Sequence, residues 1–240
     1  MGNGGHSPLN CNPLAPLHDE IVNCRSCPRL LRYIAEVARV RRKAYRDQEY
    51  WGSPVPGFGD PAARVLILGL APAAHGANRT GRMFTGDRSG DWLYRVLHRT
   101  GFASQPESVS RADGMRLTGA YITAAARCAP PGNKPLPEEL RNCRPYLERE
   151  LELLPDIRVV VALGRIAFDT YLTLLHDRGA IARRGDYVFG HDREFRLGEG
   201  LPVLVSSYHP SQQNTSTGKL TEPMLTAVFR RAARLAHIER

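Results

Sequence analysis

Four short apolar runs, each bounded by turn residues, constrain the fold of this 240-residue chain more than any other feature. The four runs are residues 64–68, 120–124, 159–163 and 202–206. Runs of this length that are rich in β-branched and aliphatic side chains are typical of strands buried on both faces of a parallel sheet. Helical patterns separate or follow the runs, at residues 91–100, 138–154, 165–176 and 222–238. Because strands and helices alternate, the sequence predicts an α/β domain with a parallel sheet.

Three other segments have predictions of their own. Residues 30–51 have the apolar spacing of an amphipathic helix, whose basic side either faces solvent or binds DNA. Pro145 divides the helix predicted at 138–154 or starts a new one. Residues 184–197 are expected to form an inserted hairpin around the turn at 190–192.

The N-terminal end differs in composition from the rest of the chain. Residues 1–16 are crowded with Gly, Asn and Pro and lack the apolar run of a secretory signal, so they are predicted to be a disordered tail. Residues 17–240 are then a single domain that is long enough to bury a core. No segment approaches the ~20 apolar residues of a membrane span. We therefore expect a cytoplasmic protein that does not bind membranes.

The charge of the chain indicates a polyanionic partner. The formal net charge is +9, and the 33 basic residues include only three lysines. Arginine suits bidentate contacts to phosphate, so nucleic acid is the partner that this composition favours. A GC-rich genome, which favours arginine codons, would explain the same bias without any partner.

Four of the five cysteines form a pattern that is typical of a metal or cluster site. Two residues separate Cys24 from Cys27, and Cys27 directly precedes a proline. Cys128 and Cys143 are dispersed, with fourteen residues between them. Zinc ribbons use two close pairs, so one close pair with two dispersed thiols favours an iron–sulfur cluster over zinc. The alternative is a set of unligated buried thiols. Cys11 lies in the predicted tail and is expected to be free.

Ligands of open α/β sheets bind beyond the carboxyl ends of the strands, so the loops after the predicted strands are the candidate site. The loop at residues 69–87 is rich in glycine, lacks the phosphate-binding and dinucleotide-binding motifs, and ends at Asp87. Asp87 is either an N-terminal helix cap or a carboxylate that orients a water molecule and stabilises a cation. His209 opens the loop after the fourth strand and is either structural or an acid–base group.

Three long motifs and the cysteine pattern together resemble the family 5 uracil-DNA glycosylases, the UDGb type. The motifs are GLAPAAHGANRTGRMFTGD at 69–87, RCAPPGNKP at 127–135 and HPSQQNTSTGKLTE at 209–222. The resemblance extends from Cys24 to the C-terminus. It implies a three-layer α/β/α sandwich with a central four-stranded parallel sheet. It also implies that a [4Fe–4S] cluster is held by Cys24, Cys27, Cys128 and Cys143.

The resemblance implies roles for individual residues as well. Asp87 is the expected catalytic carboxylate, and His209 is expected to stabilise the leaving base. Phe84 would stack on that base; alternatively, Phe84 is only a core residue. Asn133 would lie near the reacting atoms; alternatively, Asn133 is only a turn residue. The other residues expected to contact the base are Ala71, Ala73, His75 and Ala124. The residues expected to contact DNA are Arg79, Arg82, Ser211, Gln212, Gln213, Asn214 and Lys219.

The chain departs from the best-known uracil glycosylases at three places. No polar side chain occupies residues 70–72, where those enzymes carry an aspartate, and Ala124 stands where they carry the asparagine that recognises uracil. Gln212 and Gln213 replace their apolar wedge. An open, less polar pocket would discriminate less between bases.

We therefore expect a monofunctional DNA glycosylase of base excision repair that removes uracil, hydroxymethyluracil and hypoxanthine. Its expected partners are double- and single-stranded DNA with damaged bases, and it is expected to act as a monomer. The alternative is a non-catalytic iron–sulfur protein that binds DNA or senses redox state. Such a protein would keep the cysteines but would not need Asp87 and His209.

Overall fold

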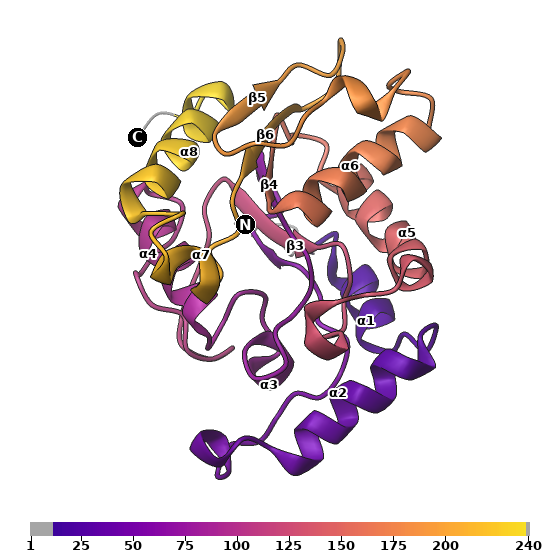
Figure 1. Cartoon of the computed structure of the whole chain (residues 1–240), viewed down its shortest axis with the longest axis vertical. Coiled ribbons are helices and arrows are strands. Elements are labelled where there is room, and N and C mark those ends of the chain that lie inside the picture. The colour runs from indigo at the N-terminus through magenta and orange to yellow at the C-terminus, as the bar shows by residue number, and fades with distance from the viewer. Residues whose placement is uncertain (1–11, 239–240) are drawn as a thin grey trace, which may run out of the picture.

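The computed structural model describes residues 12–238, so the prediction for Cys11 lies outside the described residues. The described chain forms one mixed sheet between two layers of helices (Figure 1). The predicted strands are β2 (Val65–Gly69), β3 (Ala120–Ala124), β4 (Val159–Leu163) and β6 (Val203–Ser207). They are parallel and adjacent in the order β3-β2-β4-β6, so the predicted four-stranded parallel core is confirmed.

Alternate side chains of each central strand point into opposite layers, which is why these strands are mostly apolar, with buried Thr123, Ser206 and Ser207 as exceptions toward their carboxyl ends. The helices of one layer are α4 (Arg88–Arg99) and α8 (Glu222–Leu235). Those of the other layer are α1 (Ala15–Val22), α5 (Pro137–Leu153) and α6 (Arg165–Asp177). In β2, Val65 and Ile67 belong to the core under α4 and α8, whereas Leu66 and Leu68 belong to the core under α1, α5 and α6. The expected α/β/α sandwich is therefore present.

Two short antiparallel strands extend the sheet to six, and the sequence did not predict them as edge strands. β1 (Phe58–Gly59) pairs with β3, and β5 (Arg193–Phe195) pairs with β6. The hairpin predicted within residues 184–197 is wrong, because β5 finds its partner in β6. The segment before β5 holds only the 3₁₀ turn η3 (Arg184–Asp186).

The basic helix predicted at 30–51 is wrong in its C-terminal half. α2 (Pro28–Val40) ends where Arg41 adopts a φ of 57°, a left-handed conformation that a residue with a side chain rarely adopts. The chain then passes through η1 (Lys43–Tyr45) and turns back toward the body of the domain. There the Trp51 N–H donates to the carbonyl of Arg79 at 2.9 Å. This long-range contact overrides the helical pattern.

Pro145 neither divides α5 nor starts a new helix. It lies inside one continuous helix, although a proline removes a backbone donor and costs about 3 kcal/mol in a helix interior. Cys143 and Leu147 are buried on either side of it. Packing on both sides of the proline therefore keeps the helix continuous.

The tail predicted at residues 1–16 is wrong at its C-terminal end, because α1 starts at Ala15 and the neighbouring Leu14 and Leu17 are buried. The prediction for residues 1–11 lies outside the described residues. Among residues 12–238, no helix has both the length and the apolar character needed to cross a membrane. The remaining short elements are α3 (Ala77–Thr80), η2 (Pro131–Asn133) and α7 (Gln212–Ser216).

Candidate active site

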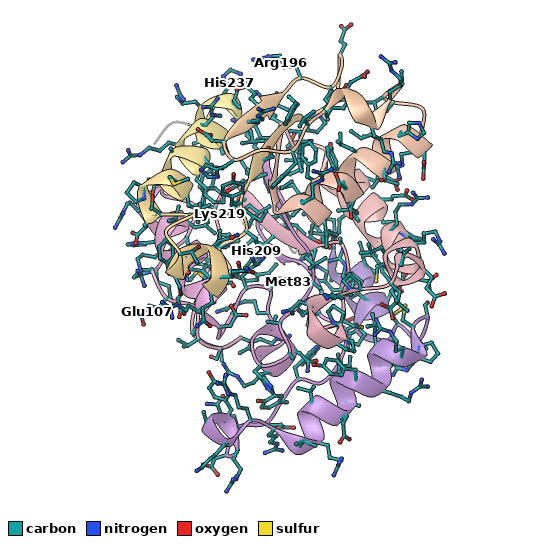
Figure 2. The ribbon with its side chains drawn as sticks, viewed as in Figure 1. Met83, Glu107, Arg196, His209, Lys219 and His237 are labelled. Carbon is teal, nitrogen blue, oxygen red and sulfur yellow. The ribbon has the colours of Figure 1, made fainter. Side chains whose placement is uncertain are left out.

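A cavity of about 510 Å³ lies beyond the carboxyl ends of the parallel strands. We call it the Asp87 cavity. Met83 and His209, which Figure 2 labels near the middle of the view, both line it. The sequence-predicted residues among its lining are Ala71, Ala73, Phe84, Asp87, Asn133, His209, Ser211, Gln212 and Gln213. Three separate loops therefore deliver the predicted groups to one place.

Asp87 caps the N-terminus of α4 through one of its two carboxylate oxygens. Its Oδ1 accepts the N–H of Gly90 at 3.0 Å, so the cap reading of the sequence is correct in part. Its Oδ2 lies so close to Gly76 that a Cβ on Gly76 would meet it at 2.0 Å. Burial raises the pKa of Asp87, and the backbone N–H groups of Gly90 and Ser89 offset part of that rise. One oxygen of the carboxylate is thus held by the helix N-terminus, and the other lies beside the Gly76 backbone.

His209 is held as a neutral imidazole. Burial lowers its pKa to about 4, so the ring carries no charge near pH 7. The side-chain amide of Asn214 donates to the His209 carbonyl at 2.9 Å, and the Ser211 hydroxyl caps α7. The short helix therefore fixes the turn that carries the imidazole.

Phe84 stacks against His209, with ring centroids 5.7 Å apart and planes inclined by 30°. Its φ is 52°, a strained conformation for a residue with a bulky side chain. A Cβ on Gly69 would meet the Phe84 ring at 2.9 Å, and a Cβ on Gly90 would meet its carbonyl oxygen at 1.8 Å. The two glycines leave the room that this strained aromatic requires.

Three other predicted contacts to the base have different positions. Asn133 is exposed, has a φ of 56° and lines the cavity. Ala124 is buried in the core and is not among the described residues that line the Asp87 cavity. His75 lines a neighbouring groove, where its Nδ1 lies 3.1 Å from the Tyr50 hydroxyl. Ala124 is therefore a core residue here.

Two arginines that were expected to contact DNA instead hold the 69–87 loop together. Arg82 is 4% exposed and pairs with Asp113 at 2.5 Å while donating to Ser108 and Thr85. Arg79 is 8% exposed and donates to the carbonyls of His75 and Gly86. The prediction for Arg82 is wrong because its side chain is buried and its Nε and Nη2 donate inside the protein. Arg79 remains at the edge of the neighbouring groove.

The other predicted DNA contacts lie on α7 and its flanks. Gln212, Gln213 and Lys219 are exposed, and the Lys219 ammonium lies 4.8 Å from the Tyr208 ring centroid. Asn214 is half-buried and its amide is committed to His209. The exposed members of the group remain free to meet a ligand.

A groove of about 1400 Å³ adjoins the Asp87 cavity and shares Ala73, Asp87, Arg88, Asn133 and Gln212 with it. We call it the Arg42 groove. It is lined by cationic and aromatic residues that the sequence analysis did not assign to the site: Tyr33, Arg42, Tyr45, Arg88, Trp92 and Arg95. The basic character of the 30–51 segment was the signal for Arg42 and Tyr45. Arg88 could have been found because it directly follows Asp87.

The four cysteines lie in one region. Cys27, Cys128 and Cys143 are buried and Cys24 is partly exposed. Burial raises the pKa of the Cys128 thiol, and the charges of the other three cysteines raise it further. Burial raises the pKa of Cys143 to about 11. Within residues 12–238, no three His, Cys, Asp or Glu side chains are grouped so that they could hold a metal ion.

The buried guanidinium of Arg127, which directly precedes Cys128 in the sequence, has hydrogen-bond donors that are unpaired within residues 12–238. Arg127 is 1% exposed, and neither its Nε nor its Nη1 has a hydrogen-bond partner among the described residues. The positive charge of Arg127 lowers the pKa of Cys143, opposing the effect of burial. Unused donors beside buried thiols fit a sulfur-rich anionic group that accepts hydrogen bonds.

Comparison with known proteins agrees with this geometry. Residues 56–233 match the family model of the uracil DNA glycosylase superfamily. The chain is 55% identical over 217 residues to a type-5 uracil-DNA glycosylase of Mycobacterium tuberculosis, a match that covers 90% of this chain and 79% of that protein. It is 53% identical over 213 residues to a type-5 enzyme of Thermus thermophilus, covering 89% and 94%. It is 46% identical over 215 residues to one of Pyrobaculum aerophilum, covering 90% of each. The chain belongs to the uracil-DNA glycosylase superfamily.

Proposed function

We propose that this protein is a monofunctional DNA glycosylase that hydrolyses the bond between deoxyribose and uracil in DNA repair. The observation that carries the proposal is the meeting of a carboxylate, a neutral imidazole and a strained aromatic ring around one cavity. Family membership supports the same conclusion. A DNA-binding or redox-sensing protein without catalysis would have no use for this arrangement.

Asp87 acts on the sugar and the attacking water. As the base departs, the sugar becomes cationic, and a nearby carboxylate stabilises that charge and orients water. Oδ1 is held by the Gly90 N–H, so Oδ2 is the oxygen that faces the reaction. No lysine is among the described residues that line the cavity, which favours hydrolysis by water over a lysine adduct.

His209 acts on the departing base. The base leaves with negative charge on its ring, and a neutral imidazole donates an N–H to an oxygen that gains charge. Since burial holds the His209 pKa near 4, the ring donates without being protonated first. Phe84 offers the face on which the extruded base stacks, a contact that tolerates any base.

The Arg42 groove is the proposed path of the DNA strand. Reaching the sugar requires extrusion of the nucleotide from the stack, which costs a few kcal/mol and least at a mismatch. Arg42, Arg88 and Arg95 supply cations beside the cavity, and Tyr45 and Trp92 supply aromatic faces. Such a surface suits both double- and single-stranded DNA. The exposed Gln212 and Gln213 are the residues that we propose as the wedge that enters the duplex.

Broad substrate choice is part of the proposal. Ala71 and Ala73 line the cavity with small side chains. Small walls admit a C5 substituent or a purine, so the pocket would discriminate little between bases. Hydroxymethyluracil and hypoxanthine are therefore further substrates. Ala73→Phe should lower hypoxanthine excision much more than uracil excision, and equal losses on both bases would argue against an open pocket.

The four cysteines are proposed to hold a [4Fe–4S] cluster with a structural role. Zinc ribbons use two close cysteine pairs, whereas this chain has one close pair and two dispersed cysteines, a pattern typical of a cluster. The donors of buried Arg127 that lack a partner in the described part of the chain, next to Cys128, suit a sulfur-rich anionic group. It would join the segment before α2 to the loop after β3 and to α5. Purified protein should be brown with four irons per chain; colourless protein with bound zinc would contradict the assignment.

The experiment that tests the activity is excision from an oligonucleotide that carries one uracil. The product is heated in alkali and resolved on a gel, and Asp87→Asn purified in parallel controls for contaminating enzymes. Cleavage by the wild-type protein alone is the expected result. The proposal fails if the wild type leaves the strand intact. A cytoplasmic location and a monomeric state remain proposals of the same kind, and sedimentation of the purified protein tests the second.

A further inference from the structure

A buried polar network lies behind the loop that follows β3, and the proposed reaction does not use it. Its centre is an ion pair between Arg127 and Glu150, which are 1% and 0% exposed. Their Nη2 and Oε2 atoms are 2.6 Å apart. A buried pair of this kind gains little net stability, because both charges lose their hydration. Its presence therefore calls for another explanation.

The two partners of the pair are not equally satisfied. Glu150 accepts from the Thr123 hydroxyl at 2.6 Å and from the Tyr121 hydroxyl at 3.2 Å in addition to Arg127. His18 continues the network, with its Nε2 2.8 Å from the Tyr121 hydroxyl. The Glu150 carboxylate thus accepts hydrogen bonds from three side chains.

The guanidinium, in contrast, uses one of its three nitrogens. Nε and Nη1 of Arg127 have no partner among the described residues. A buried donor without a partner costs about 1–3 kcal/mol, and more when it is charged. Two such donors on one side chain indicate that a ligand completes the site.

The surroundings of Arg127 identify the chemistry of that ligand. Arg127 directly precedes Cys128, and its backbone N–H donates to the Cys143 thiol. The network's carboxylate already accepts from three donors, whereas the charge of Arg127 lowers the pKa of the nearby Cys143 thiol, so we assign the free donors to sulfur acceptors. Iron-bound thiolates and sulfides carry negative charge and accept N–H donors, and such bonds set the properties of a cluster.

We propose that Arg127 is a positioning residue of the four-cysteine site, donating its free N–H groups to the sulfur atoms of the cluster and balancing their charge. This inference rests on the cluster assigned under the proposed function, not on the identity of the excised base. Glu150 holds the guanidinium in place and needs Thr123 and Tyr121 to do so. The network therefore joins β3 and α5 at the point where both supply a cluster ligand.

The same residue extends its effect toward the Asp87 cavity. The Arg127 carbonyl accepts the Val55 N–H at 2.7 Å, and six residues later the loop places Asn133 at the cavity. One side chain thus fixes the segment that carries both Cys128 and Asn133. Loss of Arg127 should disturb the cluster first, because Arg127 directly precedes Cys128 and its charge acts on the Cys143 thiol.

The test compares Arg127→Met, which removes charge and donors, with Arg127→Lys, which keeps the charge alone. Arg82→Met is the matched control, since Arg82 is also buried and paired with a carboxylate but has no contact with a cysteine. Iron and sulfide per chain, the reduction potential and the rate of bleaching by a chelator in air are measured on purified protein. These readouts do not depend on excision.

Arg127→Met should shift the potential to a more negative value, because a nearby positive charge favours the reduced cluster. It should bleach about tenfold faster or more, the size expected for a lost hydrogen bond to a charged group. Arg127→Lys should recover most of the potential but not the bleaching rate. If Arg127→Met does not fold, the double variant Arg127→Met/Glu150→Gln removes the pair without leaving a buried charge, and it should bleach as fast.

Wild-type potential and bleaching in the Arg127 variants would overturn the proposal, as would an equal change in Arg82→Met. Wild-type protein without iron would overturn it too. That last result leaves uracil excision standing, because the oligonucleotide assay is independent of the metal analysis. Conversely, a brown protein that excises no base would refute the activity and leave the role of Arg127 intact.

Discussion

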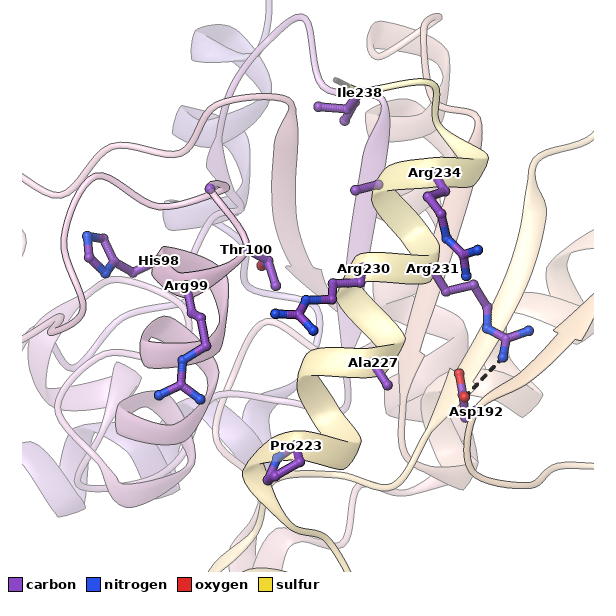
Figure 3. A pocket seen from close by; sticks show the side chains of 12 residues that line it. His98, Arg99, Thr100, Asp192, Pro223, Ala227, Arg230, Arg231, Arg234 and Ile238 are labelled. Carbon is purple, nitrogen blue, oxygen red and sulfur yellow. Dashed lines mark hydrogen bonds and ion pairs between the residues drawn. The ribbon is translucent and has the colours of Figure 1, made fainter. Parts of the chain in front are cut away.

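Two cavities, one along α4 and α8 and one beyond the carboxyl ends of the strands, show how little size says about function. The larger of the two, of about 900 Å³, lies between α4 and α8 and is lined by Arg99, Arg230, Arg231 and Arg234 (Figure 3). We call it the Arg230 cavity. The Asp87 cavity has about 510 Å³. Arg64, which directly precedes β2, donates to the carbonyl of His237 beyond α8, so the Arg230 cavity extends toward the amino ends of the strands.

The carboxylates of the two cavities differ in their partners. Asp192 in the Arg230 cavity is paired with Arg231 at 3.1 Å, a contact drawn in Figure 3. Asp87 is held by backbone N–H groups of α4 and has no ion pair among the described residues. A neutralised carboxylate on a basic surface cannot stabilise a cation that forms during a reaction. Reactivity therefore follows from the environment of the carboxylate, and the position at the carboxyl ends of the strands supplies that environment.

The largest effect should come from Asp87→Asn. The amide keeps the helix cap but cannot stabilise the cationic sugar or take a proton from water, so single-turnover excision should fall about 10²-fold to 10⁴-fold. Rapid-quench kinetics with a uracil oligonucleotide measure it. Asp192→Asn is the matched control in the Arg230 cavity and should excise at the wild-type rate. Equal losses in both variants would erase the distinction between the two cavities.

His209→Ala should have the next largest effect. Removing a donor aimed at the developing charge typically costs about 10²-fold to 10³-fold in rate. Affinity for lesion DNA should change much less, which a titration at equilibrium can measure. A variant that keeps the wild-type rate would reduce His209 to a structural residue, and Asn133 would then be the group to substitute next.

The buried imidazole should also make the fold sensitive to acid. The folded-state pKa of His209, about 4, lies below the unfolded value of 6.5, so the unfolded chain binds more protons between these values. Stability should therefore fall as the pH drops through this window, by up to about 3 kcal/mol at 1.36 kcal/mol per unit. Urea unfolding at several pH values measures the free energy of unfolding. In His209→Asn this free energy should fall less between pH 6.5 and pH 4 than in the wild type. The same pH dependence in both proteins would show that the ring is hydrated in the folded state.

Phe84→Leu should have a smaller effect than either catalytic substitution. Stacking on one base contributes about 1–3 kcal/mol, and leucine replaces only part of that contact. Excision of uracil and hypoxanthine should fall together, because stacking does not distinguish bases. Ile238→Ala, in the Arg230 cavity, is the control. A loss confined to one base would mean that Phe84 reads the base rather than supports it.

The smallest effect should come from Arg230→Ala and Arg234→Ala. Both arginines are exposed and line the Arg230 cavity, away from the carboxyl ends of the strands. Excision and the dependence of DNA affinity on salt should stay within about twofold of wild type, whereas Arg88→Ala should lower the salt slope by about one contact. A salt slope reduced by Arg230→Ala would place DNA on both edges of the sheet.

Much of the fold could be predicted because its central strands need no long-range information. A strand buried on both faces is apolar at most positions, so β2, β3, β4 and β6 are evident from their residues alone. The edge strands β1 and β5 are two and three residues long and have no periodicity to find. Their existence depends on the neighbouring strand. The end of α2 at Arg41 likewise depends on where Tyr50 and Trp51 pack.

The candidate site was predictable in its position and less so in its details. Asp87 and His209 could be named because each follows a predicted strand. Arg82 was misassigned because its partner Asp113 is 31 residues away, and nothing local shows that the side chain is buried. The Arg42 groove was only partly foreseen, because its walls come from segments separated along the whole chain.

The sequence by itself determined which residue types stand at the carboxyl ends of the strands, and with them the class of chemistry. Tertiary structure alone decided the protonation state of His209, the burial of Asp87 at the N-terminus of α4, and the inward direction of the Arg82 and Arg127 side chains. Pattern and motif are local properties, set by neighbours within a few residues. Burial, pKa and hydrogen-bond saturation depend on atoms that only folding brings together, and those quantities decide what a carboxylate or an imidazole can do.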